Sequence, residues 1–299
     1  MNRRPDAAAI ELDEVSKSFE TANGRVNALS TVDLTVQEGE FLGVVGPSGS
    51  GKTTLLRLIA GLDRPSAGTV RIGGRSVENG PDTGFVFQEV TLFPWRTVEE
   101  NVRLGLEVGD SESIDRRVDE LLAMVGLADR RTASPEELSG GMATRVGIAR
   151  ALAPDPEILL LDEPFADLDV ATRERLQDDL LALWDRLGKT VVLVTHTVGE
   201  AVRLADRVLV LQGPPGHVAS VVDVDLDRPR DPDTDPYRPY VRSIRNAIRG
   251  DSRSRGSGRG EGSPRRRTHK ATAQARDHPF GPPLDSTRHL NHRSIQHDT

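Results

Sequence analysis

Gly46-Pro47-Ser48-Gly49-Ser50-Gly51-Lys52-Thr53 is the stretch of the sequence that decides the fold. It has the spacing G-x-x-x-x-G-K-[ST] of loops that cradle nucleotide phosphates. The apolar run 41–45 before it predicts a buried strand, and residues 54–60 after it predict the first turns of a helix. The sequence therefore predicts a strand, a glycine-rich turn and a helix in succession.

Each fixed position of this loop has a chemical reason. Glycines lack a Cβ, so successive backbone N–H groups can turn inward towards an anion, and the helix N-terminus adds partial positive charge. Lys52 supplies a full positive charge for the β- and γ-phosphates, and the Thr53 hydroxyl is a ligand for Mg²⁺. The alternative is a glycine-rich turn that arose by chance. The predicted nucleotide-binding residues here are Gly46, Pro47, Ser48, Gly49, Ser50, Gly51, Lys52, Thr53 and Thr54.

The composition sets bounds on the class of protein. The 299 residues suffice for one large or two modest domains, and 36% of them are hydrophobic. No apolar run reaches the roughly 18–20 residues of a membrane span, and no apolar segment follows the arginines near the N-terminus. The chain has no cysteine, which excludes disulfides and thiolate chemistry. We expect a protein that stays in the cytoplasm.

The net charge of −7 is unevenly distributed. Residues 250–299 hold ten Arg and Lys against five Asp and Glu, so residues 1–249 carry a net charge of −12. An acidic, lysine-poor surface argues against nucleic acid as a partner. Such a surface suits a high-salt cytoplasm, and a GC-rich genome that encodes Arg in place of Lys gives the same composition; both explanations stay open.

Buried apolar runs alternate with amphipathic helical patterns along the first 222 residues. Runs 84–87, 158–161 and 190–194 predict buried strands, and residues 204–211 predict the last strand. Residues 89–150 are predominantly helical in pattern. This alternation predicts an α/β fold whose sheet is covered on both faces, with a helical subdomain inserted at about 89–150.

The pattern fades after residue 222. Residues 223–249 predict a short C-terminal extension that ends in an amphipathic helix, and residues 250–299 have the composition of a disordered tail. The tail holds five of the seven histidines and the run 265–267 of three arginines, which leave metal or phosphate binding as open alternatives. A read-through extension without function is another.

Further motifs follow in a fixed order: Gln88 after a strand, Leu138-Ser139-Gly140-Gly141-Met142 before a helix, 158–163 as a strand ending in Asp162-Glu163, and His196 after the next strand. Residues 10–222 therefore resemble the ATP-binding subunit of an ABC transporter. The resemblance implies a P-loop NTPase cassette with a RecA-like α/β core, an antiparallel β subdomain and an inserted α-helical subdomain. It also implies ATP and Mg²⁺ as ligands.

The resemblance assigns roles to individual residues. It implies that Asp162 and Gln88 join Thr53 in binding Mg²⁺, that Glu163 is the general base, and that His196 and Gln88 complete the catalytic group. Phe19 stands where the family stacks an aromatic ring on adenine. Ser139, Gly140 and Gly141 belong to the signature motif, which in the family faces the phosphate loop of a second subunit. A dimer with a second copy of the chain is thus implied, although a heterodimer of cassettes remains open.

At four places the sequence departs from the family's most common residues without removing a phosphate-binding, metal-binding or basic group. Met142 stands where many cassettes have Gln, Ala143-Thr144 precede Arg145, Ala166-Asp167 occupy the D-loop, and Thr197 replaces the usual Asp. These departures bear on the rate and on coupling across the dimer.

The run 88–102 contains Leu92-Phe93-Pro94-Trp95-Arg96-Thr97-Val98 and resembles importers of nitrate, sulfonate, taurine or bicarbonate. Pro215-Gly216 resembles the same group. The resemblance implies integral membrane permease partners, an extracellular or periplasmic binding protein reached through the permease, and a peripheral position on the cytoplasmic face of the membrane. The exposed aromatic residues would receive the permease; the alternative is that Trp95 packs inside the helical subdomain. A soluble ABC ATPase not coupled to transport and a non-hydrolysing regulatory cassette are the other function classes.

Overall fold

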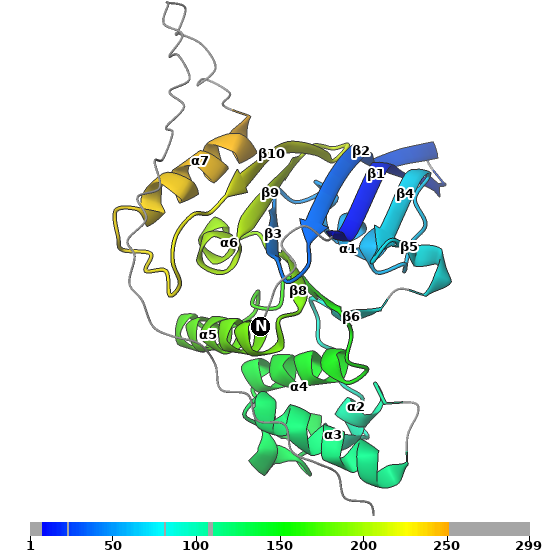
Figure 1. Ribbon diagram of the computed structural model, residues 1–299, viewed down its shortest axis with the longest axis vertical. Helices are drawn as coiled ribbons and strands as arrows, with labels where there is room; N and C mark the ends of the chain where they lie inside the picture. The colour runs from blue at the N-terminus through cyan, green and yellow to red at the C-terminus, as the bar shows by residue number, and fades with distance from the viewer. Residues whose placement is uncertain (1–7, 23, 81, 107–109, 251–299) are drawn as a thin grey trace, which may run out of the picture. The chain divides into compact units, whose positions relative to one another are not determined.

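Two β-sheets, with helices packed against them, make up the computed structural model over the residues that it describes, 8–22, 24–80, 82–106 and 110–250 (Figure 1). The larger sheet has the strand order β10-β9-β3-β8-β7-β6. Its strands are β3 (Phe41–Val45), β6 (Thr83–Val86), β7 (Ile158–Asp162), β8 (Thr190–Val194), β9 (Arg207–Gln212) and β10 (His217–Asp223). The neighbouring strands β9, β3, β8, β7 and β6 are parallel, whereas β10 pairs antiparallel with β9.

The parallel strands are apolar throughout because both of their faces are covered. Every residue of β3, β7 and β8 is buried. Side chains alternate between two cores: Leu42 and Val44 enter one, and Phe41 and Val45 enter the other. The alternation of five-residue apolar runs with helices correctly predicted this sheet.

The smaller sheet is antiparallel, with the order β2-β1-β4-β5. Its strands are β1 (Ala8–Thr21), β2 (Gly24–Gln37), β4 (Ala67–Ile72) and β5 (Arg75–Ser76). Helix α1 (Lys52–Ile59) buries its leucines in the core that this sheet shares with the larger one. Backbone hydrogen bonds also tie β2 to the loop after β9: Ser30 N donates to Gly216 O at 2.7 Å, and Gly216 N donates to Ala28 O at 2.9 Å.

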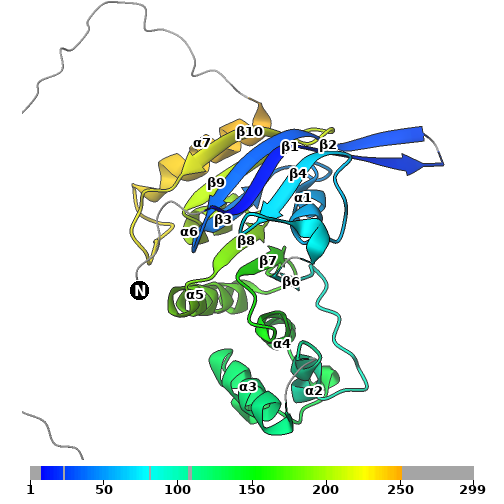
Figure 2. The same ribbon diagram turned by 45° about the vertical axis from the view of Figure 1, so that its right-hand side comes forward.

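The inserted helical region lies beyond α5 and β6, on the side away from the smaller sheet (Figures 1 and 2). It contains α2 (Val98–Arg103), α3 (Ser111–Met124) and α4 (Gly140–Leu152), with short 3₁₀ turns at Ala128–Arg130 and Pro135–Glu137. Thr97 caps α2 in a reciprocal arrangement with Glu100. A further 3₁₀ turn, Val77–Asn79, follows β5. Three more helices are α5 (Val170–Leu187), α6 (Val198–Leu204) and α7 (Tyr237–Arg249). They pack in the core that Phe41 and Val45 enter, together with α2, α3 and α4.

The C-terminal part departs from the expectation that the last strand ends near residue 211. Residues 217–223 form β10, a half-buried edge strand with alternating exposure. Its short, mixed pattern becomes a strand because β9 offers a free edge for pairing. The predicted amphipathic helix is present as α7, and it packs on α6, β9 and β10. The predicted tail, 250–299, lies outside the described residues apart from Gly250.

Arg230 fastens the segment between β10 and α7 to the end of α6. Its guanidinium is buried and donates to the carbonyls of Leu226, Val202, Ala205 and Val224 at 2.5–2.9 Å. Burial lowers the pKa of Arg230 to about 10, so the side chain keeps its charge at neutral pH. One buried cation therefore satisfies carbonyl groups of two separate backbone segments, 202–205 and 224–226.

We expect Arg230→Met to destabilise the fold, because three buried carbonyl groups and one part-buried carbonyl group lose their donor. The free energy of unfolding should fall by about 3 kcal/mol, measured by urea denaturation followed by circular dichroism. Arg75→Met, at an exposed position of β5, is the matched control. Equal midpoints for Arg230→Met and the unaltered protein would contradict the fastening role.

Candidate functional site

The loop between β3 and α1 needs its glycines for steric reasons. Gly49 and Gly51 have φ of +78° and +82°, in the left-handed region. A Cβ on Gly46 would lie 2.4 Å from the Leu211 carbonyl oxygen, and one on Gly51 would lie 2.5 Å from the Leu29 side chain. The close packing of these neighbours thus fixes the backbone of the loop, which leaves a cradle at the N-terminus of α1.

Lys52, the first residue of α1, has an almost fully buried side chain. Its Nζ donates to the carbonyl oxygens of Gly46 at 3.1 Å and Pro47 at 3.2 Å. Burial lowers the pKa of Lys52, and the nearby carboxylates of Glu163 and Asp162 oppose that shift. Among the described residues no carboxylate lies within ion-pair distance of Nζ. The ammonium group is therefore available to an anion in the cradle.

Oxygen donors lie next to this lysine at the end of β7. The Thr53 hydroxyl donates to the buried Asp162 carboxylate at 3.3 Å. Burial raises the pKa of Asp162, and the hydrogen bond from Thr53 opposes the shift. Gln88 follows β6, is exposed and lines the same cleft. A hydroxyl, a carboxylate and an amide oxygen are hard donors of the kind that Mg²⁺ takes alongside substrate phosphates.

Glu163 and His196 face each other across the ends of β7 and β8. His196 Nδ1 lies 3.0 Å from Glu163 Oε2, and the Glu163 N–H donates to the Val194 carbonyl at 2.9 Å. Glu163 has φ of +47°, which is unusual for a residue with a Cβ and is a recurrent feature of functional sites. The backbone is thus held in a strained turn that places the carboxylate at the edge of the sheet.

A cleft of about 590 Å³ collects most of the predicted residues. It is lined by Ser48, Gly49, Gly51, Lys52, Thr53, Thr54, Gln88, Glu163 and His196. It is also lined by Val26, Asn27, Ala28 and Pro214, which sequence reasoning missed. No local motif marks these four, because they reach the cleft only through the bridge between β2 and the loop after β9. Phe19, exposed and paired with Val26 on the neighbouring strand, is not among the lining residues.

The signature residues lie elsewhere, at the N-terminus of α4. The Ser139 hydroxyl accepts from Met142 N at 3.3 Å and caps the helix. A Cβ on Gly141 would lie 2.6 Å from the Thr172 methyl group, so α4 and α5 approach closely at this glycine. None of Ser139, Gly140 and Gly141 lines the nucleotide cleft of its own chain. The phosphate loop and residues 139–141 are therefore separate elements of this chain.

Hydrogen bonds and an ion pair hold the residues on either side of His196, and they were not predicted from the sequence. Thr195 Oγ1 donates to Glu200 Oε2 at 2.5 Å and accepts from Thr197 N at 3.0 Å, so it braces both sides of His196. Glu200 Oε1 lies 3.6 Å from Arg173 Nε. Burial raises the pKa of Glu200.

The same arginine reaches the loop before α5. Arg173 donates to the carbonyl oxygens of Phe165 at 3.3 Å and Leu168 at 2.8 Å. The segment around His196 and the loop that follows Glu163 are therefore joined through one Glu–Arg pair. Arg173 and Glu200 are 27 positions apart, and neither belongs to a motif that spacing alone would single out.

Aromatic residues gather on the surface between β6 and α2. Trp95 is 75% exposed and Phe93 is 39% exposed, and their rings meet edge to face at 5.4 Å between centroids. Asn101, fully buried in α2, holds this loop by accepting from Phe93 N and donating to backbone carbonyls. The structure therefore favours an exposed aromatic surface over packing of Trp95 inside the helical region.

This arrangement of phosphate loop, acidic strand end and histidine defines a P-loop ATP-binding cassette. The family model "ABC transporter" matches residues 29–166. The chain is 49% identical over 243 residues to an uncharacterized ABC transporter ATP-binding protein of Methanocaldococcus jannaschii, covering 80% of this chain and 91% of that protein. The chain therefore belongs to the ABC transporter family, as an ATP-hydrolysing subunit.

Two relatives carry more specific names. The aliphatic sulfonates import ATP-binding protein SsuB of Bacillus subtilis is 43% identical over 241 residues, which cover 80% of this chain and 92% of SsuB. The nitrate import ATP-binding protein NrtD of Synechocystis is 44% identical over 234 residues, with coverage of 77% and 87%.

A solved dimeric structure of an ATP-binding cassette in a post-hydrolysis state with ADP and Pi is also similar. It has a TM-score of 0.65 and 35% identity, and it matches 73% of this chain and 100% of that one. Family and fold predicted from the motifs are thus confirmed. No helix among the described residues is both long and apolar enough to cross a membrane.

We expect Glu163→Gln to leave ATP affinity within a few-fold and to lower the hydrolysis rate by about 100-fold or more, the usual contribution of a general base. Nucleotide binding and phosphate release measure the two effects. Glu112→Gln, on the exposed face of α3, is the control. A hydrolysis rate within threefold of that of the unaltered protein would show that Glu163 is not the general base.

Proposed function

We propose that this chain hydrolyses ATP with Mg²⁺ at the β3–α1 cleft and drives a membrane importer of small anions. The observation that carries the proposal is the placement of Lys52, Thr53, Asp162, Glu163 and His196 along one edge of the parallel sheet. Each group has a distinct task, and together they cover phosphate binding, metal binding and proton removal.

Each of these residues has its own role in the reaction. Lys52 and the backbone N–H groups of the loop hold the β- and γ-phosphates. Thr53, Asp162 and Gln88 would hold Mg²⁺, which when bound neutralises charge on the phosphate oxygens. Glu163 accepts a proton from water as its oxygen attacks the γ-phosphorus, and the bond to the β–γ bridging oxygen breaks to give ADP and phosphate. His196, within hydrogen-bond distance of Glu163, orients that carboxylate.

The separation of Ser139–Gly141 from the cleft supports assembly with a second cassette. A helix N-terminus with glycines and a capping serine is suited to contact a γ-phosphate, yet it lies away from the cleft of its own chain. A second copy would bring its α4 to this cleft and receive α4 of the first in return. The similar solved cassette is described as dimeric, which agrees with this arrangement.

The exposed pair of Phe93 and Trp95 suits a helix presented by a membrane permease. Aromatic side chains on an otherwise polar surface mark interfaces, and tryptophan dominates the binding energy of many. The names of SsuB and NrtD refer to import of aliphatic sulfonates and nitrate. We assign this chain to importers of that kind of anion, on the inner face of the membrane, with a binding protein delivering the anion to the permease.

We expect Trp95→Ala to spare ATP hydrolysis by the free subunit and to weaken its association with the permease by about tenfold or more. Co-purification and affinity measurements with the permease in detergent test this effect. Leu62→Ala, at an exposed position after α1 and outside the nucleotide cleft, is a control for loss of exposed apolar area. Undiminished association would place the permease on another surface, and a partner that is not a membrane protein would favour a cassette uncoupled from transport.

A further inference from the structure

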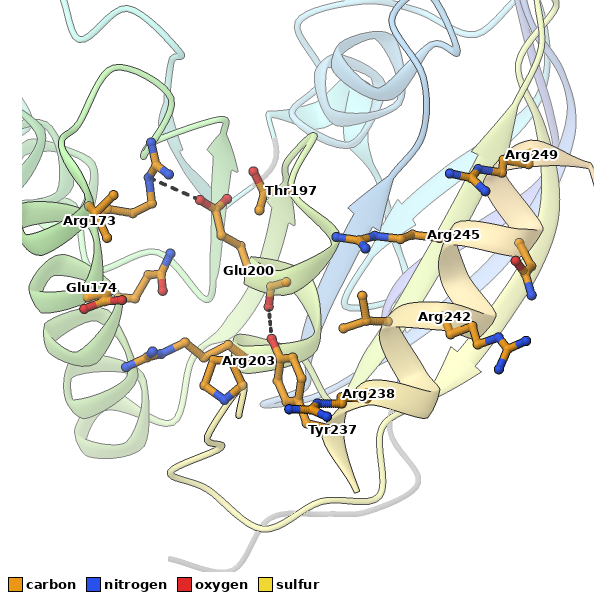
Figure 3. A pocket seen from close by; sticks show the side chains of 16 residues that line it. Arg173, Glu174, Thr197, Glu200, Arg203, Tyr237, Arg238, Arg242, Arg245 and Arg249 are labelled. Atoms are coloured by element: carbon orange, nitrogen blue, oxygen red, sulfur yellow. Dashed lines mark hydrogen bonds and ion pairs between the residues drawn. The ribbon is translucent and has the colours of Figure 1, made fainter. Parts of the chain in front are cut away.

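A second cavity lies between α5, α6 and α7, on elements that the nucleotide cleft does not use. Its volume is about 750 Å³, and it shares no lining residue with that cleft. Figure 3 shows side chains from all three helices around it. The volume falls within the range of roughly 300–1,000 Å³ that is typical of sites for small organic molecules.

The lining of this cavity is strongly basic in a chain whose first 249 residues are acidic. Two glutamates are present, Glu174 and Glu200, and Glu200 is engaged with Arg173. The arginines number six: Arg173, Arg203, Arg238, Arg242, Arg245 and Arg249. Positive charge therefore exceeds negative charge around the cavity by a wide margin.

The side chains of three of these arginines have no partner among the described residues. Within the part of the chain that the structure describes, Arg242, Arg245 and Arg249 make neither an ion pair nor a hydrogen bond, whereas Arg203 pairs with Asp178 at 2.7 Å. With Arg238, they follow the i, i+4, i+7, i+11 spacing of one helix face. Like charges at such spacing destabilise a helix, and an anion between them would remove that repulsion.

Two of the arginine side chains of α7 point towards the place where such an anion would be held. In Figure 3, Arg245 and Arg249 extend from α7 towards α6 and Thr197. Tyr237 is fixed at one end of the cavity by a hydrogen bond from its hydroxyl to the Gly199 carbonyl at 2.5 Å. Val170 and Val241 add apolar surface to the lining. This combination suits a compact organic anion with several charged groups and a carbon skeleton.

The cavity also touches the network that braces His196. Thr197, Glu200 and Arg173 line it directly, and Glu200 binds the Thr195 hydroxyl. A second anion near Arg173 would compete with Glu200 for that guanidinium. Release of Glu200 from Arg173 would loosen the link between the His196 segment and the loop before α5, which Arg173 holds through backbone carbonyls.

We propose that this cavity binds a small organic polyanion bearing carboxylate, phosphate or sulfate groups, and that its occupancy changes the rate of ATP hydrolysis through Arg173 and Glu200. Anion binding at this cavity does not depend on the proposed function, whereas the effect on the rate of ATP hydrolysis rests on that function. Residues 251–299 are excluded as occupant by their charge, since they carry ten Arg and Lys against five Asp and Glu. An acidic peptide is disfavoured because the cavity has the volume of a metabolite site.

Binding is tested on the full-length Lys52→Ala variant without Mg²⁺, which weakens anion binding at the phosphate loop. Citrate, inorganic phosphate and sulfate are titrated separately by calorimetry at low salt. We expect citrate to bind one site per chain with a Kd of about 1 mM or tighter. Arg245→Ala/Arg249→Ala in the same background should weaken citrate by about tenfold or more, because two charge-assisted contacts are lost.

The matched control is Arg71→Ala/Arg75→Ala, which removes the same charge from exposed positions of β4 and β5. It should leave the citrate Kd within about twofold, since long-range charge effects are screened. Thermal unfolding of both double variants checks that each is folded. The site is refuted by equal weakening in the two double variants, by no binding of any of the three anions, or by binding of a hexaglutamate peptide alone.

The rate effect is tested on the protein with Lys52 intact, at constant free Mg²⁺. Citrate at saturation should change phosphate release by at least about twofold, and Arg245→Ala/Arg249→Ala should abolish that response. A response of equal size in the double variant, or no response where calorimetry shows citrate bound, would overturn the coupling. Absence of ATP hydrolysis in every sample would instead contradict the proposed function and leave the binding result standing.

Discussion

The register of four parallel strands is the constraint on which the site depends. Val194 on β8 lies opposite both Val44 on β3 and Asp162 on β7, and Val86 on β6 lies opposite Leu161. The strands therefore end together, and the residues that follow them meet at one edge of the sheet. A slip of one residue in β7 would turn Asp162 to the other face and separate it from Thr53.

That register also explains what could be predicted. Five-residue aliphatic runs buried on both faces are recognisable in one dimension, as is a loop in which three glycines and Lys52 hold fixed spacing. Because parallel strands deliver their C-terminal ends to one edge, Gln88, Asp162, Glu163 and His196 could be expected to lie near the phosphate loop. Most of that set does line one cleft.

The features that were missed depend on pairs that are distant in sequence. Residues 26–28 join the cleft only because Gly216, nearly two hundred residues later, binds the backbone of β2. The strand at 217–223 exists because β9 has a free edge. Arg173 and Glu200 lie on different helices, and each alone would be taken for an ordinary surface charge. Only the folded chain brings such partners together.

The division of the interior into two cores bears on how the aromatic surface and the arginine-lined cavity could be coupled. The core that contains α2 and α3 continues through α4 and α5 to α6 and α7, whereas α1 and the smaller sheet bury their side chains in the other. Packed interiors transmit displacement because they have few voids. The aromatic surface at Phe93 and Trp95 and the arginine-lined cavity thus rest on one continuous body of side chains, on the opposite face of the sheet from the phosphate-loop helix.

The left-handed backbone at Glu163 has a consequence for the evolution of the chain. A glycine or asparagine would adopt that conformation more easily, and for a glutamate the strain is on the order of 1 kcal/mol. Selection for stability alone would therefore remove the carboxylate from this position. The glutamate at this position therefore agrees with the proposed role of its side chain in hydrolysis, for which a strained backbone would be retained.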